Sequence, residues 1–179
     1  MKKIIFLAFI STICFLSAEA RAPQKLTQGS LDFLNGVKNL NIIFDYTDLI
    51  INGKTEEYVA AKNGERWAKN WDKDKIQFNK LFIASANMEL IERNAALRLG
   101  DFPDAEYAAT VKVLKMIDRS HGYTAEVIFT QPDSTDILAV ISIDYRDITI
   151  DSTLTITIKN MMTEAGKQFA KLIVKNIKQ

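Results

Sequence analysis

The chain has 179 residues, of which 47% are hydrophobic and 25% are charged, and its formal net charge at pH 7 is +1. A chain of this length is typical of one domain with a substantial hydrophobic core. The near-balance of charge excludes the strongly basic surface that nucleic-acid binders use, so we expect no nucleic-acid partner.

Residues 1–20 have the three parts of a secretory signal peptide. A lysine pair at positions 2 and 3 precedes an almost unbroken apolar run over 4–16, and residues 17–20 offer a small-x-small cleavage pattern. The apolar run is too short to span a bilayer comfortably, and no stop-transfer flank follows it. We therefore expect cleavage after Ala20 and export to the periplasm or the cell exterior, with no transmembrane span in the mature chain.

Loss of this leader changes both the charge and the thiol content. Removing Lys2, Lys3 and Glu19 from 23 basic and 22 acidic residues leaves 21 of each, so the exported part is neutral. Cys14, the only cysteine, lies inside the leader, and residues 11–13 do not match a lipobox, so we expect no lipid anchor. A thiol-free mature chain excludes disulfides and thiolate chemistry and suits an oxidising compartment.

The first part of the mature chain is expected to be a linker followed by a strand. Residues 21–36 are polar and contain two glycines, which predicts an N-terminal tether before a single domain at 37–179. Apolar and polar side chains alternate over 40–46, the pattern of a half-buried strand. Asn52-Gly53 is expected to end that strand.

Two helical regions follow. Thr55-Glu56-Glu57 places acidic residues in a first helical turn, and a helix or helix pair is predicted over 55–72, with Asn63-Gly64 as a possible break. A longer helix is predicted over 74–96. Apolar side chains spaced by three and four residues are expected to form its core-facing stripe: Leu81, Ala84, Met88, Ile91 and Ala95.

Three alternating segments then predict an antiparallel meander over 106–113, 123–130 and 137–145. The segment 153–158 alternates like a strand, but the apolar spacing that begins at 158 favours a helix over 158–177, with Ser152 or Asn160 as its cap. The expected order is β-α-α-β-β-β-α. This order predicts an α+β domain: an antiparallel four-stranded sheet with helices packed on one face.

No catalytic or metal-binding set stands out. His121 is the only histidine and lies in a predicted turn, which excludes a histidine-rich zinc site. The aspartates at 133, 136, 144, 147 and 151 are spaced like turn residues rather than a calcium loop. No phosphate-binding glycine motif occurs. We therefore expect no metal, no cofactor and no enzymatic activity, although a hydrolase that uses an unrecognised pair of carboxylates stays open as a third alternative.

Trp67 and Trp71 are the most distinctive pair, because four-residue spacing puts both rings on one helix face. Two interpretations remain open. The rings can form an exposed platform for a glycan or a partner, or they can lock the helix against the rest of the domain and bury a large apolar area.

The exported leader together with "LNIIFDYTDLIINGKTEEYV", the Trp-x-x-x-Trp segment, "AEYAATVKVLKM" and "EAGKQFAKLIVK" resembles small exported proteins of Bacteroides-type bacteria, which have no assigned activity. The element order is also similar to periplasmic α+β modules of outer-membrane assembly and secretion lipoproteins. The resemblance implies no functional residues. Export together with the absence of a recognisable catalytic set predicts a non-enzymatic envelope protein that binds another periplasmic or outer-membrane component, with a cell-envelope protein as the expected partner. A small-ligand or glycan binder that uses an aromatic face is the alternative.

Overall fold

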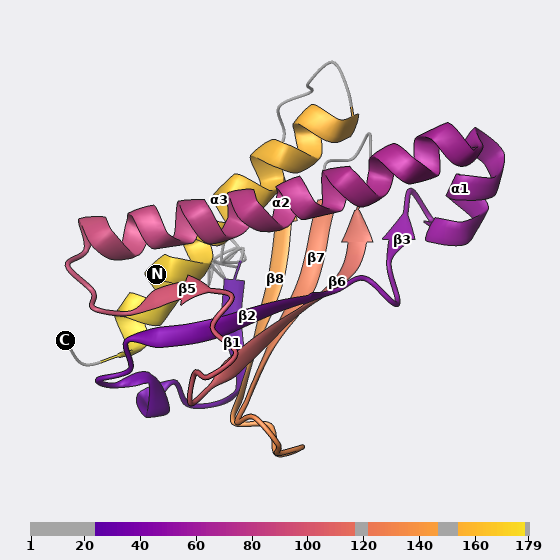
Figure 1. Ribbon diagram of the computed structural model, residues 1–179. Helices are drawn as coiled ribbons and strands as arrows, with labels where there is room; N and C mark the ends of the chain where they lie inside the picture. The colour runs from indigo at the N-terminus through magenta and orange to yellow at the C-terminus, as the bar shows by residue number, and fades with distance from the viewer. Residues whose placement is uncertain (1–23, 117–121, 147–153, 178–179) are drawn as a thin grey trace, which may run out of the picture.

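The computed structural model describes residues 24–116, 122–146 and 154–177. These residues form a mixed β-sheet and three α-helices (Figure 1). The strands are β1 (Gln24–Gly29), β2 (Asn39–Asp45), β3 (Ile50–Ile51), β4 (Lys54–Thr55), β5 (Arg98–Gly100), β6 (Ala108–Met116), β7 (Gly122–Thr130) and β8 (Ala139–Arg146), and the helices are α1 (Glu56–Asn63), α2 (Glu65–Glu92) and α3 (Leu154–Asn176), with a short 3-10 turn, η1 (Asp32–Leu34).

The α+β class is confirmed, but the expected antiparallel four-stranded sheet is wrong. In the described part of the chain the sheet has eight strands, with the main order β1-β8-β7-β6-β2-β5 and with β3 and β4 attached beside β6. β6, β7 and β8 form the predicted antiparallel meander. β2, however, pairs in parallel with both β5 and β6.

The parallel pairing follows from the connection between β2 and β6. The chain leaves β2 and passes through α1 and α2, and α2 brings it back along the sheet before β5 and β6 begin. A helical crossover of this kind returns the chain to the same end of the sheet, so the next strand runs in the same direction. Alternation of side chains predicts a strand, but it carries no information on the direction of its neighbour.

The segment expected to be a tether contributes a strand instead. β1 pairs antiparallel with β8, and its Gln24 side chain is buried and donates a hydrogen bond to the Ala165 carbonyl of α3 at 2.7 Å. At the end of β1, Gly29 has a φ of +72°, and a Cβ added there would lie 1.9 Å from the Leu138 carbonyl oxygen. The polar composition of this edge strand hid it, because Leu26 is its only large apolar residue.

The core lies between one face of the sheet and the pair α2 and α3, which lie side by side (Figure 1). Alternate residues of the central strands are fully buried on this face, including Val111, Val127 and Ile141. Phe82 of α2 joins the layers, because its ring lies 5.6 Å from the Phe44 ring of β2 and 5.5 Å from the Phe169 ring of α3.

The expected core-facing stripe of the second helix is wrong for four of its five residues: only Ala95 is buried, and it lies beyond the end of α2. Met88 and Ile91 are 61% and 54% exposed, whereas the buried stripe contains Trp71, Phe78, Phe82, Ser85, Ala86, Glu89 and Leu90. α2 carries apolar residues on two faces, so spacing alone could not decide which one packs. The bulkier aromatic stripe is the one that faces the sheet, since it buries more apolar area.

Three helix boundaries also differ from the prediction. The helix predicted over 74–96 ends at Glu92. The helices expected to end at 72 and to begin at 74 are one continuous helix, α2, because nothing in this polar stretch breaks the backbone. α3 begins at Leu154 rather than 158, so Asn160 lies within the helix and is not its cap. The candidate cap Ser152 lies outside the described residues.

Candidate functional site

One corner of the molecule, at one end of the packed core, is built from β3, β4, α1 and the first turns of α2; we call it the α1 corner (Figure 1). Asn52 and Gly53 connect β3 to β4 with φ angles of 48° and 73°. These left-handed values suit the two-residue hairpin turn that Asn-Gly favours. The expectation that this pair ends the strand over 40–46 is wrong, because β2 ends at Asp45 and the pair instead joins two shorter strands. β3 pairs in parallel with the end of β6, on the side where β2 pairs with its beginning, and Ile51 is opposite Met116.

α1 begins directly after the hairpin and is capped at both ends. The Thr55 side chain accepts a hydrogen bond from the Tyr58 amide at 3.3 Å, and two glutamates occupy the first turn. Gly64 ends the helix with a φ of +82° and connects it to α2, which confirms the break predicted at Asn63-Gly64. No residue of α1 is buried, so this helix is attached to the fold without forming part of its core.

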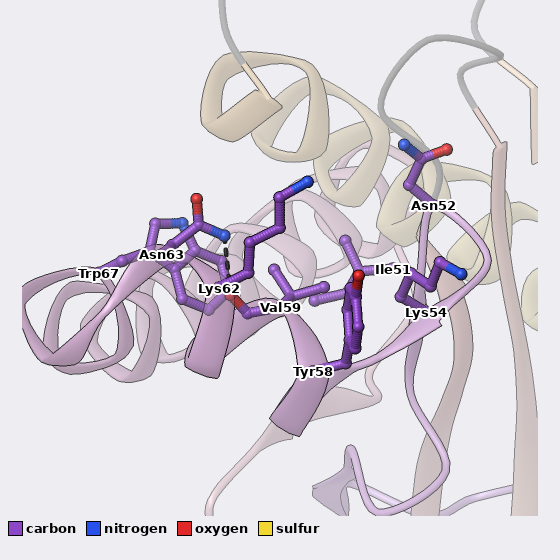
Figure 2. A pocket seen from close by; sticks show the side chains of 8 residues that line it. All are labelled: Ile51, Asn52, Lys54, Tyr58, Val59, Lys62, Asn63 and Trp67. Carbon is purple, nitrogen blue, oxygen red and sulfur yellow. Dashed lines mark hydrogen bonds between the residues drawn. The ribbon is translucent and has the colours of Figure 1, made fainter.

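The α1 corner contains a hollow of about 380 Å³, which we call the Trp67 hollow. Figure 2 shows its lining side chains, which come from the hairpin, one face of α1 and the start of α2. They combine two aromatic rings, two aliphatic side chains, two carboxamides and two lysines: Tyr58, Trp67, Ile51, Val59, Asn52, Asn63, Lys54 and Lys62. The volume lies within the range of small-molecule sites, roughly 300–1,000 Å³.

The two tryptophans occupy different environments, although they stack on one another. Their ring centroids are 5.3 Å apart with an interplanar angle of 11°. Trp71 is only 3% exposed and packs edge-on against Phe78 at 5.7 Å, so its ring belongs to the core. Trp67 is half-buried and lines the hollow. Trp71 thus forms a rigid base beneath Trp67, and one indole of the pair reaches the candidate site.

The two lysines of the hollow differ from the neighbouring Lys75 in their carboxylate partners. The Lys75 ammonium lies 2.7 Å from a Glu56 carboxylate oxygen and 3.1 Å from one of Asp72. Burial lowers the pKa of Lys75, but these two carboxylates raise it by more, so the charge is held and neutralised locally. By contrast, no carboxylate of the described residues lies within 4.0 Å of the Lys54 or Lys62 amine.

A tyrosine layer lies where the α1 corner meets the core. Tyr46 donates a hydrogen bond to the Asn79 carboxamide oxygen at 2.6 Å, and the Lys75 ammonium lies 5.6 Å from its ring. Burial, followed by the Glu56 charge, raises the pKa of Tyr46, and burial raises that of the fully enclosed Tyr123. These hydroxyls therefore stay neutral and act as structural groups.

Among the described residues, the other candidates from the sequence give no site. Within the described ranges, no group of three histidine, cysteine, aspartate or glutamate side chains is placed to hold a metal ion. Asp133 adopts a φ of 63°, as expected of a turn residue. His121, Asp147 and Asp151 lie outside the described residues, as does the leader with Cys14. No helix in the described part of the chain is long and apolar enough to cross a membrane.

Sequence reasoning found Trp67 but missed the residues that surround it. Lys54, Lys62 and the two carboxamides come from a hairpin turn and a short helix, so no regular spacing connects them. The signal that could have found them is the pair of Asn-Gly steps at 52–53 and 63–64. Each step turns the chain, and together they bring α1 between the hairpin and Trp67.

Comparison with known proteins gives a distant structural likeness and no family. No protein-family model matches the sequence, and no curated protein matches it. The PelC dodecamer from Paraburkholderia phytofirmans is similar in structure at 9% sequence identity and a TM-score of 0.43, over 87% of this chain and 98% of that chain. A single-site variant of the same PelC gives 8% identity, the same TM-score and the same coverage. These values define neither a family nor a function for this chain.

Proposed function

We propose that this protein is an exported binding protein without catalytic activity, and that it binds a component of the cell envelope in the Trp67 hollow. The export step rests on the signal-peptide pattern of residues 1–20. The binding site is proposed on one observation: a concave surface combines the Trp67 ring, which stacks on Trp71, with lysine and carboxamide side chains.

The shape of the site favours a small ligand or glycan over a protein partner. A stable protein interface buries about 800 Å² on each side, and it is usually built on broad surfaces. The Trp67 hollow is instead local: its lining comes from the β3–β4 hairpin, α1 and the first turn of α2 (Figure 2). Sites of this composition orient a ligand with a few polar groups against an apolar wall.

Catalysis gains no support from this site. Histidines and carboxylates are the commonest general acids and bases in enzymes. The eight lining side chains include neither a carboxylate nor a histidine. Their chemistry suits recognition, so we assign the hydrolase alternative no residues.

Photo-crosslinking in the native cell envelope tests the proposal. A benzophenone amino acid replaces Tyr58, which is 53% exposed at the hollow, and in a control it replaces Ile137, which is 46% exposed elsewhere. We expect an adduct at position 58 that Trp67→Ala removes, and none at 137. Mass spectrometry of the adduct shows whether the component is a glycan or a protein. Equal labelling at both positions, or no adduct at 58, contradicts the proposal.

A further inference from the structure

We infer that the ligand of the Trp67 hollow is an acidic glycan, with sugar rings that carry carboxylate groups. This inference rests on the proposed function and names its ligand class. Three properties of the lining lead to it: uncompensated positive charge, supported aromatic faces and available carboxamides. Each property selects one part of such a ligand.

The positive charge comes from Lys54 on β4 and Lys62 in the last turn of α1. Neither amine has a carboxylate within 4.0 Å among the described residues, whereas the neighbouring Lys75 has two. The Glu56 and Asp72 carboxylates are thus paired with Lys75, whereas the two lysines of the hollow have no such partner among the described residues. A ligand with carboxylates supplies the missing partners, and its attraction weakens with salt.

The aromatic faces select a ring-shaped ligand. Trp67 is held by its 5.3 Å stack on the buried Trp71, so binding does not have to order it. Tyr58 is 53% exposed, and the Lys54 ammonium lies 5.3 Å from its ring centroid. A pyranose has an apolar C–H face that packs on such rings, and this arrangement places its carboxylate near the lysine.

The carboxamides select hydroxyl groups. Asn63 donates one hydrogen bond to the Val59 carbonyl at 2.7 Å, which fixes the side chain and leaves its carbonyl oxygen free of donors among the described residues (Figure 2). Asn52 is fixed through its backbone, because its amide donates to the Met116 carbonyl at 2.9 Å. Each carboxamide can donate to one sugar hydroxyl and accept from another.

A compact phosphate fits this site less well. Phosphate sites commonly add backbone amides at a helix N-terminus or an arginine fork to their lysines. Here the Thr55 side chain already occupies the Tyr58 amide of α1, and no arginine lines the hollow. Lys62 and Asn63 come from the carbonyl end of the helix, which repels a dianion. A singly charged carboxylate on a sugar ring is repelled less than a phosphate dianion, because the repulsion scales with the charge.

Titration with defined sugars tests the inference. The purified chain is titrated with trigalacturonate, a neutral trisaccharide and inorganic phosphate, and binding is followed by tryptophan fluorescence, which reports on Trp67 and Trp71 alone. We expect trigalacturonate to bind at least tenfold more tightly than the neutral sugar at low salt. We also expect Lys54→Gln/Lys62→Gln to remove this preference. The matched control Lys25→Gln/Lys38→Gln changes the net charge equally at two exposed sites outside the hollow and should leave the preference intact.

Three outcomes overturn the inference. A neutral sugar that binds as tightly as trigalacturonate removes the acidic specificity but leaves the proposed function standing. Phosphate that binds as tightly points to a compact anion. If none of the three probes binds, the acidic-glycan hypothesis is rejected. The proposed function is then tested separately by the adduct at position 58. Circular dichroism of every variant confirms that the fold is retained.

Discussion

The core and the α1 corner differ in how fully their side chains are used by the fold. In the core, α2 and α3 approach closely, and rings such as Phe82 and Phe169 are completely buried. In the α1 corner, α1 buries no residue, and two lysines and two carboxamides face the Trp67 hollow. Stability therefore comes from the core, which leaves the side chains of the corner free to bind. Trp71 and Trp67 are the point where the two regions meet.

The largest effect is expected in the core. Phe82→Ala removes a fully buried ring that contacts both β2 and α3, and should lower the free energy of unfolding by about 3–5 kcal/mol. Met88→Ala on the exposed face of the same helix should change it by less than about 1 kcal/mol. Urea denaturation measures both. Equal losses would show that the buried face of α2 is assigned wrongly.

The close contact between α2 and α3 predicts whether a substitution at Gly166 raises or lowers stability. A Cβ at Gly166 of α3 would lie 2.3 Å from both the Phe82 carbonyl oxygen and the Ser85 hydroxyl of α2. Helix propensity alone predicts that Gly166→Ala stabilises a helix by about 1 kcal/mol. Because the neighbouring backbone must shift, we expect a loss of about 1–3 kcal/mol instead. A gain in the thermal midpoint would contradict the close approach of α2 and α3.

The tyrosine layer between the regions makes the protein sensitive to alkali. Burial raises the pKa of Tyr46 above its unfolded value of about 10, and the Glu56 charge adds to this effect. The unfolded chain then loses the proton first, so stability is complete below about pH 10 and falls as the pH rises further. Tyr46→Phe should flatten this fall by up to about 1.4 kcal/mol per pH unit. An unchanged slope in chemical denaturation between pH 10 and 11 would contradict the burial of Tyr46.

The sequence was sufficient to predict the features that depend on local backbone conformation. Asn63-Gly64 predicted the break between α1 and α2, and Gly64 there has a positive φ. Asn52-Gly53 was correctly expected to form a turn, although this turn joins β3 to β4 and does not end the preceding strand. The direction of β2 and the packing face of α2 depend on partners distant in the chain. Met88 and Phe82 are both apolar, and each fits the spacing of a core-facing helix stripe. Phe82 is buried and Met88 is exposed because the sheet packs against the face of α2 that contains Phe82. The sequence indicated only part of the Trp67 hollow. The spacing of the two tryptophans marks Trp67 as a candidate, whereas no sequence pattern connects Lys54 and Lys62 to it.

The most direct test of the account compares Trp67→Ala with Trp71→Ala for stability and for adduct formation at position 58. We predict that Trp67→Ala abolishes the adduct and lowers the free energy of unfolding by only about 1–2 kcal/mol, because the ring is half-buried. Trp71→Ala should cost about 3–5 kcal/mol, because its ring is in the core. An adduct that survives Trp67→Ala, or a loss of stability as large as that of Trp71→Ala, would contradict the assignment of Trp67 to a binding site.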